Sequence, residues 1–248
     1  DNHVVKPMDR TQAEPQSFQG FRGVEPAPCV DGGGGFNQDQ DDAIDLASTV
    51  IVNSTISGNT ADGCLGGGIF VTHELLLTHV TVTDNGAAAA GNVFAASTEV
   101  ALAQNTLILN PRSSTDCLSG DPVILIEGGN IDSDGSCGFG EASDQTVADV
   151  GLGALAANGG TTQTHLPQAG SPAIDAALDE FCANDDQRDV TRPQDGDGDS
   201  TTGCDVGAVE VEFTPEQTTT STTTPDEDTD ADTATPATPT VARPTFTG

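Results

Sequence analysis

The stretch NSTISGNTADGCLGGGIFV, Asn53 to Val71, determines which fold this sequence predicts. It begins with alternating β-branched and polar residues, and it closes with three glycines directly before an apolar Ile-Phe-Val run. Related runs follow along the chain: HVTVTDN ends at Asn85, QNTLILN ends at Asn110, and VILIEGGNIDSDG is a weaker copy at Val123–Gly135. The sequence numbers of the asparagines that end the first three runs differ by 85 − 59 = 26 and by 110 − 85 = 25. A fixed period in the twenties is typical of repeat proteins in which similar units stack.

Short strands with polar corners explain this period better than helices do. Each period contains two or three runs rich in Val, Ile, Thr and Leu, bounded by Asn, Gly and Asp, and such runs are typical of β-strands. No apolar i, i+3, i+4 stripe supports helices, and the leucine ladder of a leucine-rich repeat is missing. Coils that stack roughly 4.8 Å apart form a parallel β-helix with a continuous apolar core. We therefore predict an all-β chain built around a short parallel β-helix.

The glycines and asparagines of the repeat are expected to form its corners. Gly66, Gly67 and Gly68 directly precede a strand, where glycine permits a positive φ or a close approach between coils. The closing asparagines, with Asn59 and Asn85 among them, are expected to adopt the left-handed conformation or to stack as a ladder between coils. A structural role is sufficient for all of these residues.

The composition limits the partners that this protein can have. The chain of 248 residues has 7 Lys+Arg against 39 Asp+Glu, which gives a formal net charge of −32. Such a surface repels phosphate backbones and anionic membranes, so we expect no nucleic-acid partner, and a polyanionic substrate such as pectate would need calcium as a mediator. No stretch approaches the roughly 20 apolar residues that span a bilayer, so we expect no membrane insertion.

Six cysteines occur as three pairs of neighbours along the chain. Their spacings do not include C-x-x-C, and no histidines stand at zinc-ligand spacing, so disulfides are expected rather than a metal site. An even number of cysteines in a lysine-poor chain is typical of a secreted or cell-surface protein. The predicted disulfides are Cys117–Cys137, Cys182–Cys204 and, mainly by elimination, Cys29–Cys64.

Changes in composition divide the chain into four regions. Residues 1–28 lack the repeat and form an irregular lead-in, and residues 29–138 hold the β-helix coils. Residues 139–212 contain more Asp and Pro and fewer strands, so we expect an irregular C-terminal cap that covers the open strand edge. Residues 213–248 are rich in Thr, Pro and Asp without apolar periodicity, which predicts a disordered stalk.

The predicted cap contains two segments with several separated motif elements in order. They read ANGGTTQTHLPQAGSPAIDAA (Ala157–Ala177) and DQRDVTRPQDGDGDSTTGCDVGAVE (Asp186–Glu210). They resemble the C-terminal part of bacterial choice-of-anchor surface proteins of the Q type, whose pattern runs GG-x-T-x-TH, GSPAID, DQRG, RP and CDIGAxE. Asp189 stands where that pattern has glycine. The resemblance covers roughly residues 50–212 and implies a right-handed β-helix at the cell surface, without implying an activity.

A candidate calcium site lies in the second of these segments. Asp195, Asp197 and Asp199 alternate with glycines, so their carboxylate oxygens can converge on one hard cation such as Ca²⁺. The loop is not an EF-hand, because Ser200 occupies the sixth position, where an EF-hand has glycine. The alternative is a solvated acidic turn held by the predicted Cys182–Cys204 disulfide. No other cofactor is predicted.

Two further sets of polar residues in the cap favour a structural interpretation. His165, Ser171 and Asp175 have the residue types of a catalytic triad, but a proline follows the serine directly and no G-x-S-x-G motif is present. We therefore expect His165 to be a hydrogen-bonded residue of the cap. Arg188 and Arg192 stand among several aspartates, so we expect ion pairs; the alternative is recognition of an acidic sugar.

Three functions are compatible with these features. We favour a non-catalytic extracellular module that serves adhesion, surface display or matrix association, with cell-surface glycans or matrix as partners. The first alternative is a polysaccharide-active lyase or glycosidase, which needs paired carboxylates, or calcium with a base. A catalytic pair would require the fold to bring together two of the acids between residues 53 and 110, which are Asp62, Glu74, Asp84 and Glu99. The second alternative is self-assembly through exposed coil ends.

Overall fold

The computed structural model describes residues 34–38, 48–95, 101–112, 114–119 and 124–214. All of these residues lie within one compact unit of the chain, which ends at Pro215. The predicted lead-in at residues 1–28, Cys29 of the predicted Cys29–Cys64 disulfide, Glu99 and nearly all of the predicted stalk lie outside the described residues.

The described residues form β-strands and loops with no α-helix, and one 3-10 turn lies at Asp179–Phe181. The prediction of an all-β chain is therefore confirmed for this part of the protein. In the same residues, no helix has the length and apolar character needed to cross a membrane. The strands are β1 (Phe36–Gln38), β2 (Ser48–Ser57), β3 (Thr60–Leu65), β4 (Ile69–Val71), β5 (Glu74–Thr83), β6 (Gly86–Ala89), β7 (Val93–Ala95), β8 (Ala101–Gln104), β9 (Leu107–Leu109), β10 (Cys117–Ser119), β11 (Ile124–Gly128), β12 (Ile131–Asp132) and β13 (Gln145–Thr146).

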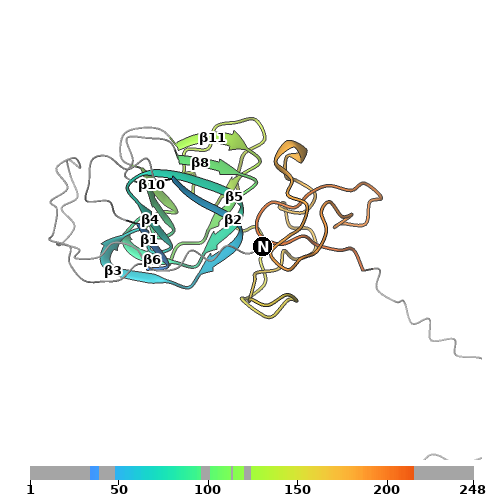
Figure 1. Cartoon of the computed structure of the whole chain (residues 1–248), viewed down its shortest axis with the longest axis horizontal. Helices are drawn as coiled ribbons and strands as arrows, with labels where there is room; N and C mark the ends of the chain where they lie inside the picture. Colours follow the sequence, from blue (N-terminus) through green and yellow to red (C-terminus); the bar gives the residue numbers. More distant parts are fainter. Residues whose placement is uncertain (1–33, 39–47, 96–100, 113, 120–123, 215–248) are drawn as a thin grey trace, which may run out of the picture. The chain divides into compact units, whose positions relative to one another are not determined.

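The pairings between these strands are parallel, and most of them join positions about one sequence period apart. β2 pairs β5 from Ser48 opposite Glu74 to Ser57 opposite Thr83, so the sequence numbers of paired positions differ by 74 − 48 = 26. β5 pairs β8 and β9 with the same offset, and β4 pairs β7 with an offset of 93 − 69 = 24. The sheet orders are β1-β4-β7-β10, β11-β8-β5-β9-β12-β13 with β2 on β5, and β3-β6. Figure 1 shows these strands stacked side by side.

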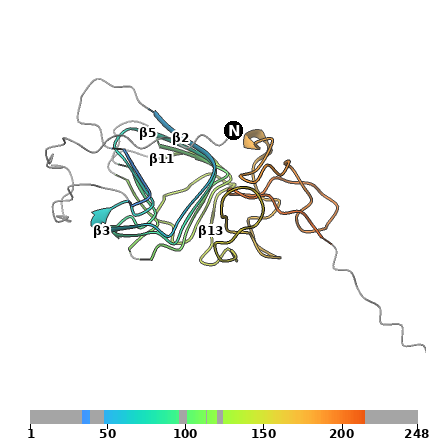
Figure 2. The same ribbon diagram turned by 60° about the horizontal axis from the view of Figure 1, so that its bottom comes forward.

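The side chains of the strands alternate between a shared interior and the opposite face, as the two-residue period of a strand requires. In β4, Ile69 and Val71 join the main apolar cluster, to which Leu75 of β5 also belongs. Phe70 lies between them in sequence but joins a separate cluster, where it stacks on Phe94 with ring centroids 5.2 Å apart. The main cluster thus draws on two sheets, and Figure 2 shows the strands around their common interior.

Two rows of corner residues in the left-handed conformation recur with the same period as the paired strands. The first row consists of Gly58, Asp84 and Asn110, with φ of 76°, 56° and 51°. The second row consists of Asn53, His79 and Asn105, with φ of 46°, 51° and 49°. Asn and Asp tolerate this region better than other residues with a side chain. The expectation that a closing asparagine adopts it is confirmed at Asn110.

One contact of the expected asparagine ladder is present, between Asn59 and Asn85 one period apart, and other polar side chains continue the row. The side-chain amide of Asn59 donates to Oδ1 of Asn85 at 3.0 Å, and that of Asn85 donates to Oδ1 of Asn92 at 3.0 Å. The amide of Asn92 in turn donates to Oδ1 of Asp116 at 2.8 Å. Buried polar groups need such partners, so these bonds help to fix the register between neighbouring strands at this corner.

Close packing between coils explains the three glycines before β4. A Cβ atom on Gly67 would lie 2.4 Å from the carbonyl oxygen of Gly86 and 2.5 Å from that of Gly91. Gly66 has a φ of 64°. The run therefore satisfies both expectations, a left-handed residue and a backbone approach that only glycine permits.

Residues 139–212 contact the coils in two ways. β13 pairs β12 and so extends the last sheet. Residues 178–185 also follow the second row of corners, where three side chains one period apart each hydrogen-bond a carbonyl oxygen of the segment. These bonds are Asn53 Nδ2 to Asp185 O at 2.7 Å, His79 Nε2 to Phe181 O at 3.1 Å and Asn105 Nδ2 to Leu178 O at 3.0 Å.

Two of the three predicted disulfides are present. Cys117 and Cys137 are bonded with their Cα atoms 4.8 Å apart, and Cys182 and Cys204 with their Cα atoms 6.1 Å apart. Both separations lie in the usual range for a disulfide. The first bridge closes a loop at the end of the coils, and the second lies in the irregular segment.

Candidate functional site

The acidic loop of the irregular segment brings together a different set of aspartates from the one predicted. Asp175, Asp195 and Asp197 can each place one carboxylate oxygen within 4.8 Å of the others. Asp199 is not in this group, and its Oδ1 accepts a hydrogen bond from the backbone N–H of Thr201 at 2.7 Å. Asp175 therefore takes the place that the alternating Asp-Gly pattern assigned to Asp199.

Backbone N–H groups surround the three clustered carboxylates. Asp175 accepts hydrogen bonds from the N–H groups of Gly196 at 3.1 Å and Asp197 at 3.2 Å. Asp195 accepts hydrogen bonds from the N–H groups of Gly198 at 2.7 Å and Ser200 at 3.0 Å. These bonds use part of the acceptor capacity of each carboxylate. A Ca²⁺ ion needs six to eight oxygen ligands, so three carboxylates would supply part of a shell that water or backbone oxygens must complete.

A buried ion pair lies at the centre of the irregular segment. Nη1 of Arg192 is 2.9 Å from Oε2 of Glu210, and both side chains have an exposed fraction of 0%. Arg192 also donates to the carbonyl oxygens of Asp205 and Gly207, each at 2.8 Å. The second carboxylate oxygen of Glu210 accepts from the backbone N–H of Gln194 at 2.7 Å. A charge pair that is wholly removed from water persists only with such additional bonds.

A second ion pair closes the turn that begins the DQR motif. Oδ1 of Asp186 accepts from the N–H groups of Arg188 at 2.6 Å and Val190 at 3.1 Å, and its Oδ2 is 2.8 Å from the Arg188 guanidinium. Asp189 within this turn has a φ of 67°, a conformation that glycine adopts more readily than residues with a side chain. Oδ2 of Asp186 also accepts from the N–H of Glu210 at 2.9 Å, so the two ion pairs form one network.

Arg188 and Arg192 have a structural role in this network. The side chains of Arg188 and Arg192 have exposed fractions of 9% and 0%, and their bonds are internal. The expectation of ion pairs is confirmed, and neither guanidinium is available to an acidic sugar. Arg188 additionally donates to the carbonyl oxygens of Asn158 and Glu210, which joins the two family-like segments to each other.

Besides the carboxylates of Asp186 and Glu210, the network contains a third buried carboxylate, that of Asp205. Its oxygens accept hydrogen bonds from the N–H groups of Asp175 at 2.8 Å and Val211 at 2.6 Å. Burial is the main cause, and the negative charge of Glu210 a further one, that together raise the pKa of Asp205 to about 7. The network therefore contains three acids and two arginines, and a proton on Asp205 balances their charges below about pH 7.

The residues of the triad considered in the sequence are not brought together. Nδ1 of His165 is 2.7 Å from the carbonyl oxygen of Gly153, and its Nε2 is 2.8 Å from Oγ of Ser57 in β2. Oγ of Ser171 instead accepts from the N–H of Ala173 at 3.2 Å, and Asp175 lies in the acidic loop. His165 is a hydrogen-bonded residue of the irregular segment, as expected, but its hydroxyl partner comes from a coil.

Ser57 and His165 line a hollow of about 340 Å³. It lies between residues 152–155 and the first row of corner residues, which are Gly58, Asp84 and Asn110. Besides the side chains of Ser57 and His165, its lining includes Asp84, Arg112 and Leu155. Sequence reasoning missed this site because Ser57 and His165 are 108 residues apart and share no local motif. The one hint in the sequence was Ser57, the polar residue directly before the glycine of the NSTISGN run.

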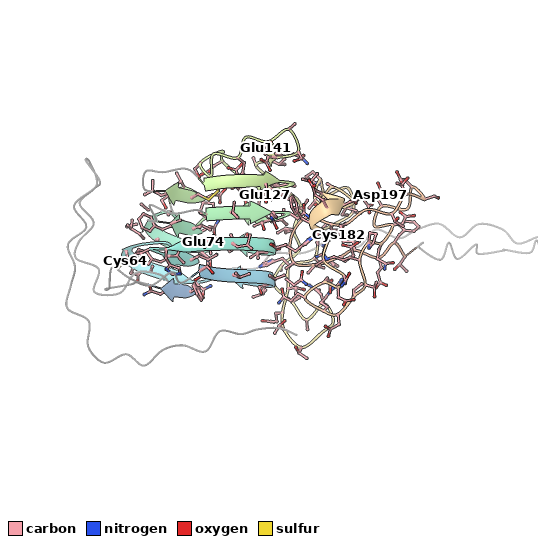
Figure 3. The ribbon with its side chains drawn as sticks, turned by 45° about the horizontal axis from the view of Figure 1, so that its top comes forward. Cys64, Glu74, Glu127, Glu141, Cys182 and Asp197 are labelled. Atoms are coloured by element: carbon pink, nitrogen blue, oxygen red, sulfur yellow. A yellow bond between two sulfur atoms is a disulfide. The ribbon has the colours of Figure 1, made fainter. Side chains whose placement is uncertain are left out.

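Of the four acids between residues 53 and 110 considered in the sequence, Glu74 and Asp84 are kept apart by the length of one strand. Glu74 begins the ten-residue strand β5 and Asp84 follows its end, whereas Asp62 lies in β3 of another sheet. In Figure 3, Glu74 lies on the stacked strands and Asp197 in the irregular segment. Glu99, the fourth acid, lies outside the described residues. A glycosidase needs two carboxyl groups roughly 5–9.5 Å apart, so these positions do not favour that chemistry.

The chain was compared with protein-family models, with curated proteins and with solved structures. Each of these comparisons gave no match. The resemblance of residues 157–177 and 186–210 to choice-of-anchor proteins therefore stays a prediction. The geometry described above is the basis on which a function can be proposed.

Proposed function

We propose that this protein is an extracellular, cell-surface module that serves adhesion, surface display or matrix association. Its main part would be a right-handed parallel β-helix. The constant offset along the sequence between β2, β5, β8 and β9 supports stacked coils, and crossovers between parallel strands are right-handed in nearly all proteins. The two disulfides are compatible with an oxidising, extracellular location.

The main observation behind this proposal is that the charged residues of the motif-like segments bond to one another inside the protein. Arg188, Arg192, Asp186 and Glu210 bond to one another and to the backbone in a buried network. The most motif-like part of the sequence thus holds the irregular segment together, and Glu74 and Asp84 lie at opposite ends of β5. Such an arrangement favours a rigid binding scaffold over a polysaccharide lyase or glycosidase.

The net charge of −32 directs the choice of partner. Long-range repulsion disfavours polyanions, so we propose neutral surface glycans or matrix proteins as ligands. Acidic glycans would bind only through a bridging cation. We propose that the cluster of Asp175, Asp195 and Asp197 takes Ca²⁺ in that role.

The full oxidised chain should be immobilised and tested by interferometry against neutral glycans, acidic glycans and matrix proteins, with calcium and with EGTA. Saturable binding to a neutral glycan or a matrix protein is the expected result, and the reduced and alkylated chain is the control for native structure. Depolymerisation of a glycan in the same samples, detected as new reducing ends or unsaturated products, would favour the enzyme alternative instead. Binding to none of the panel would contradict the adhesion proposal.

Self-assembly is a second candidate, favoured by the exposed side of β2. Within the described residues β2 pairs with β5 alone, and Val50 and Val52 on it have exposed fractions of 51% and 42%. An open strand edge with apolar side chains can pair with another chain. Sedimentation velocity over a hundredfold range of concentration tests this: a concentration-independent monomer would exclude it.

A further inference from the structure

The hydrogen bonds of His165 fix the position of its ring proton. A carbonyl oxygen only accepts hydrogen bonds, so the 2.7 Å contact with the carbonyl oxygen of Gly153 requires that Nδ1 carries the proton. In the neutral ring, Nε2 is then the acceptor, and Oγ of Ser57 donates its proton to Nε2 at 2.8 Å. The hydroxyl group of Ser57 thus donates a hydrogen bond to an imidazole ring whose orientation is fixed by Gly153.

This is the arrangement that nucleophilic catalysis requires. A serine is activated when a base lies within about 2.6–3.2 Å of its oxygen and a third group orients that base. Both distances in the Ser57–His165–Gly153 set lie in this range. A backbone carbonyl replaces the aspartate of the usual triad; it can select the tautomer but brings no full negative charge.

The hollow beside this pair contains a cation and room for a small substrate. Nη1 of Arg112 is 3.5 Å from the carbonyl oxygen of Gly58, the residue directly after Ser57. Arg112 is exposed and takes part in no ion pair within the described residues. Because Gly58 has no side chain, the guanidinium can lie over the backbone beside the hydroxyl. A positive charge at this place can stabilise the negative oxygen that forms when a carbonyl group is attacked.

We infer that Ser57 and His165 form a hydrolytic site for short-chain acyl esters. Oγ of Ser57 attacks the ester carbonyl carbon while its proton moves to Nε2 of His165. The tetrahedral intermediate then expels the alcohol, which takes the proton from His165, and an acyl-serine remains. Water, deprotonated by the same nitrogen, attacks this acyl group; the carboxylic acid leaves and the proton returns to Ser57. The atoms balance as one ester plus one water giving one alcohol and one acid.

The lining of the hollow indicates which esters fit. Asp84 and the net charge of −32 disfavour an anionic substrate. Asn110 is exposed and offers hydrogen bonds to hydroxyl groups, and Leu152 and Leu155 offer apolar surface to an acyl chain. These features suit an uncharged acetyl ester of a polyol or saccharide. This activity goes beyond the adhesion proposal and neither requires it nor excludes it.

The test uses the full oxidised chain with a fluorophosphonate probe and with p-nitrophenyl acetate. The expected result is one covalent adduct, located on Ser57 by peptide mass spectrometry, together with hydrolysis above the buffer rate. Ser57→Ala should remove the adduct. His165→Gln should slow adduct formation about 100-fold or more, the usual contribution of a general base.

The matched control is Ser171→Ala, which removes a hydroxyl of the same irregular segment outside the hollow and should leave labelling unchanged. Circular dichroism and the thermal midpoint of each variant separate lost chemistry from lost folding. Arg112→Gln is a second route to the same conclusion, since the side chain is exposed and its loss should slow labelling without altering the midpoint. The inference is wrong if the wild type is not labelled, if the adduct is on another residue, or if Ser57→Ala hydrolyses the ester at the wild-type rate.

Discussion

Arg192→Met is expected to lower the free energy of unfolding by about 3–5 kcal/mol, the usual cost of removing one partner of a buried ion pair. The guanidinium makes three hydrogen bonds, to Glu210 and to the carbonyl oxygens of Asp205 and Gly207. Their loss leaves a carboxylate with 0% exposure and no counter-ion. Nε of Arg192 has no hydrogen-bond partner in the described part of the protein, so the wild-type site is not fully satisfied. The lower end of the range is therefore expected.

Urea unfolding of the oxidised chain, followed by circular dichroism, measures this free energy. The sharper test adds Glu210→Gln to Arg192→Met. The amide removes the uncompensated charge and keeps an oxygen that can accept from the N–H of Gln194, which bonds Oε1 of Glu210 in the wild type. The N–H of Asp205, which bonds Oε2, loses its acceptor, but this neutral loss costs less than a buried charge without a partner. The double variant should therefore be more stable than Arg192→Met alone, by about 1 kcal/mol or more, as for other coupled pairs.

The matched control is Arg112→Met, which removes an exposed guanidinium that forms no ion pair within the described residues and should change stability by less than about 0.5 kcal/mol. Two results would refute the reasoning. One is a loss for Arg192→Met no larger than that of the control. The other is a double variant as unstable as the sum of the two single variants, because additive effects mean that the charges are not coupled.

Three further predictions concern other parts of the structure. Folding raises the pKa of Asp205 from 3.8 to about 7, so between these pH values the folded protein binds a proton that the unfolded chain has released. The free energy of unfolding contributed by this group therefore falls as the pH rises from about 4 to 7. Asp205→Asn should flatten this fall in urea unfolding at several pH values, and Asp62→Asn is the control that should not. Gly67→Ala should cost about 1–3 kcal/mol through contact with two carbonyl oxygens, whereas Gly140→Ala, whose nearest atom would be 3.9 Å away, should be nearly neutral. Calcium at a hundred times its Kd should raise the free energy of unfolding by about 2.7 kcal/mol, which is measured as a higher thermal midpoint than in EGTA. Asp175→Ala should remove this shift, and Asp199→Ala should keep it. If the wild type shows no shift, the acidic loop does not bind calcium.

Features that recur at a fixed spacing could be predicted from the sequence. Stacked strands put residues one period apart in contact, so the period of the asparagines, the corner at Asn110 and the Asn59–Asn85 contact follow from one repeated unit. The two observed disulfides also join near neighbours along the chain, with separations of 20 and 22 residues. In all of these cases the partner is near in sequence or one period away, where a pattern can reveal it.

The contacts between the irregular segment and the coils could not be predicted in this way. Asp175 joins Asp195 and Asp197 only because the backbone N–H groups of a folded loop close around its carboxylate. Ser57 meets His165 across 108 residues because the segment lies along the corners of several coils. A loop without strand or helix periodicity carries no signal for its docking partner. The sequence by itself therefore determined the repeat and its corners, whereas tertiary packing alone decided which polar side chains meet at the candidate sites.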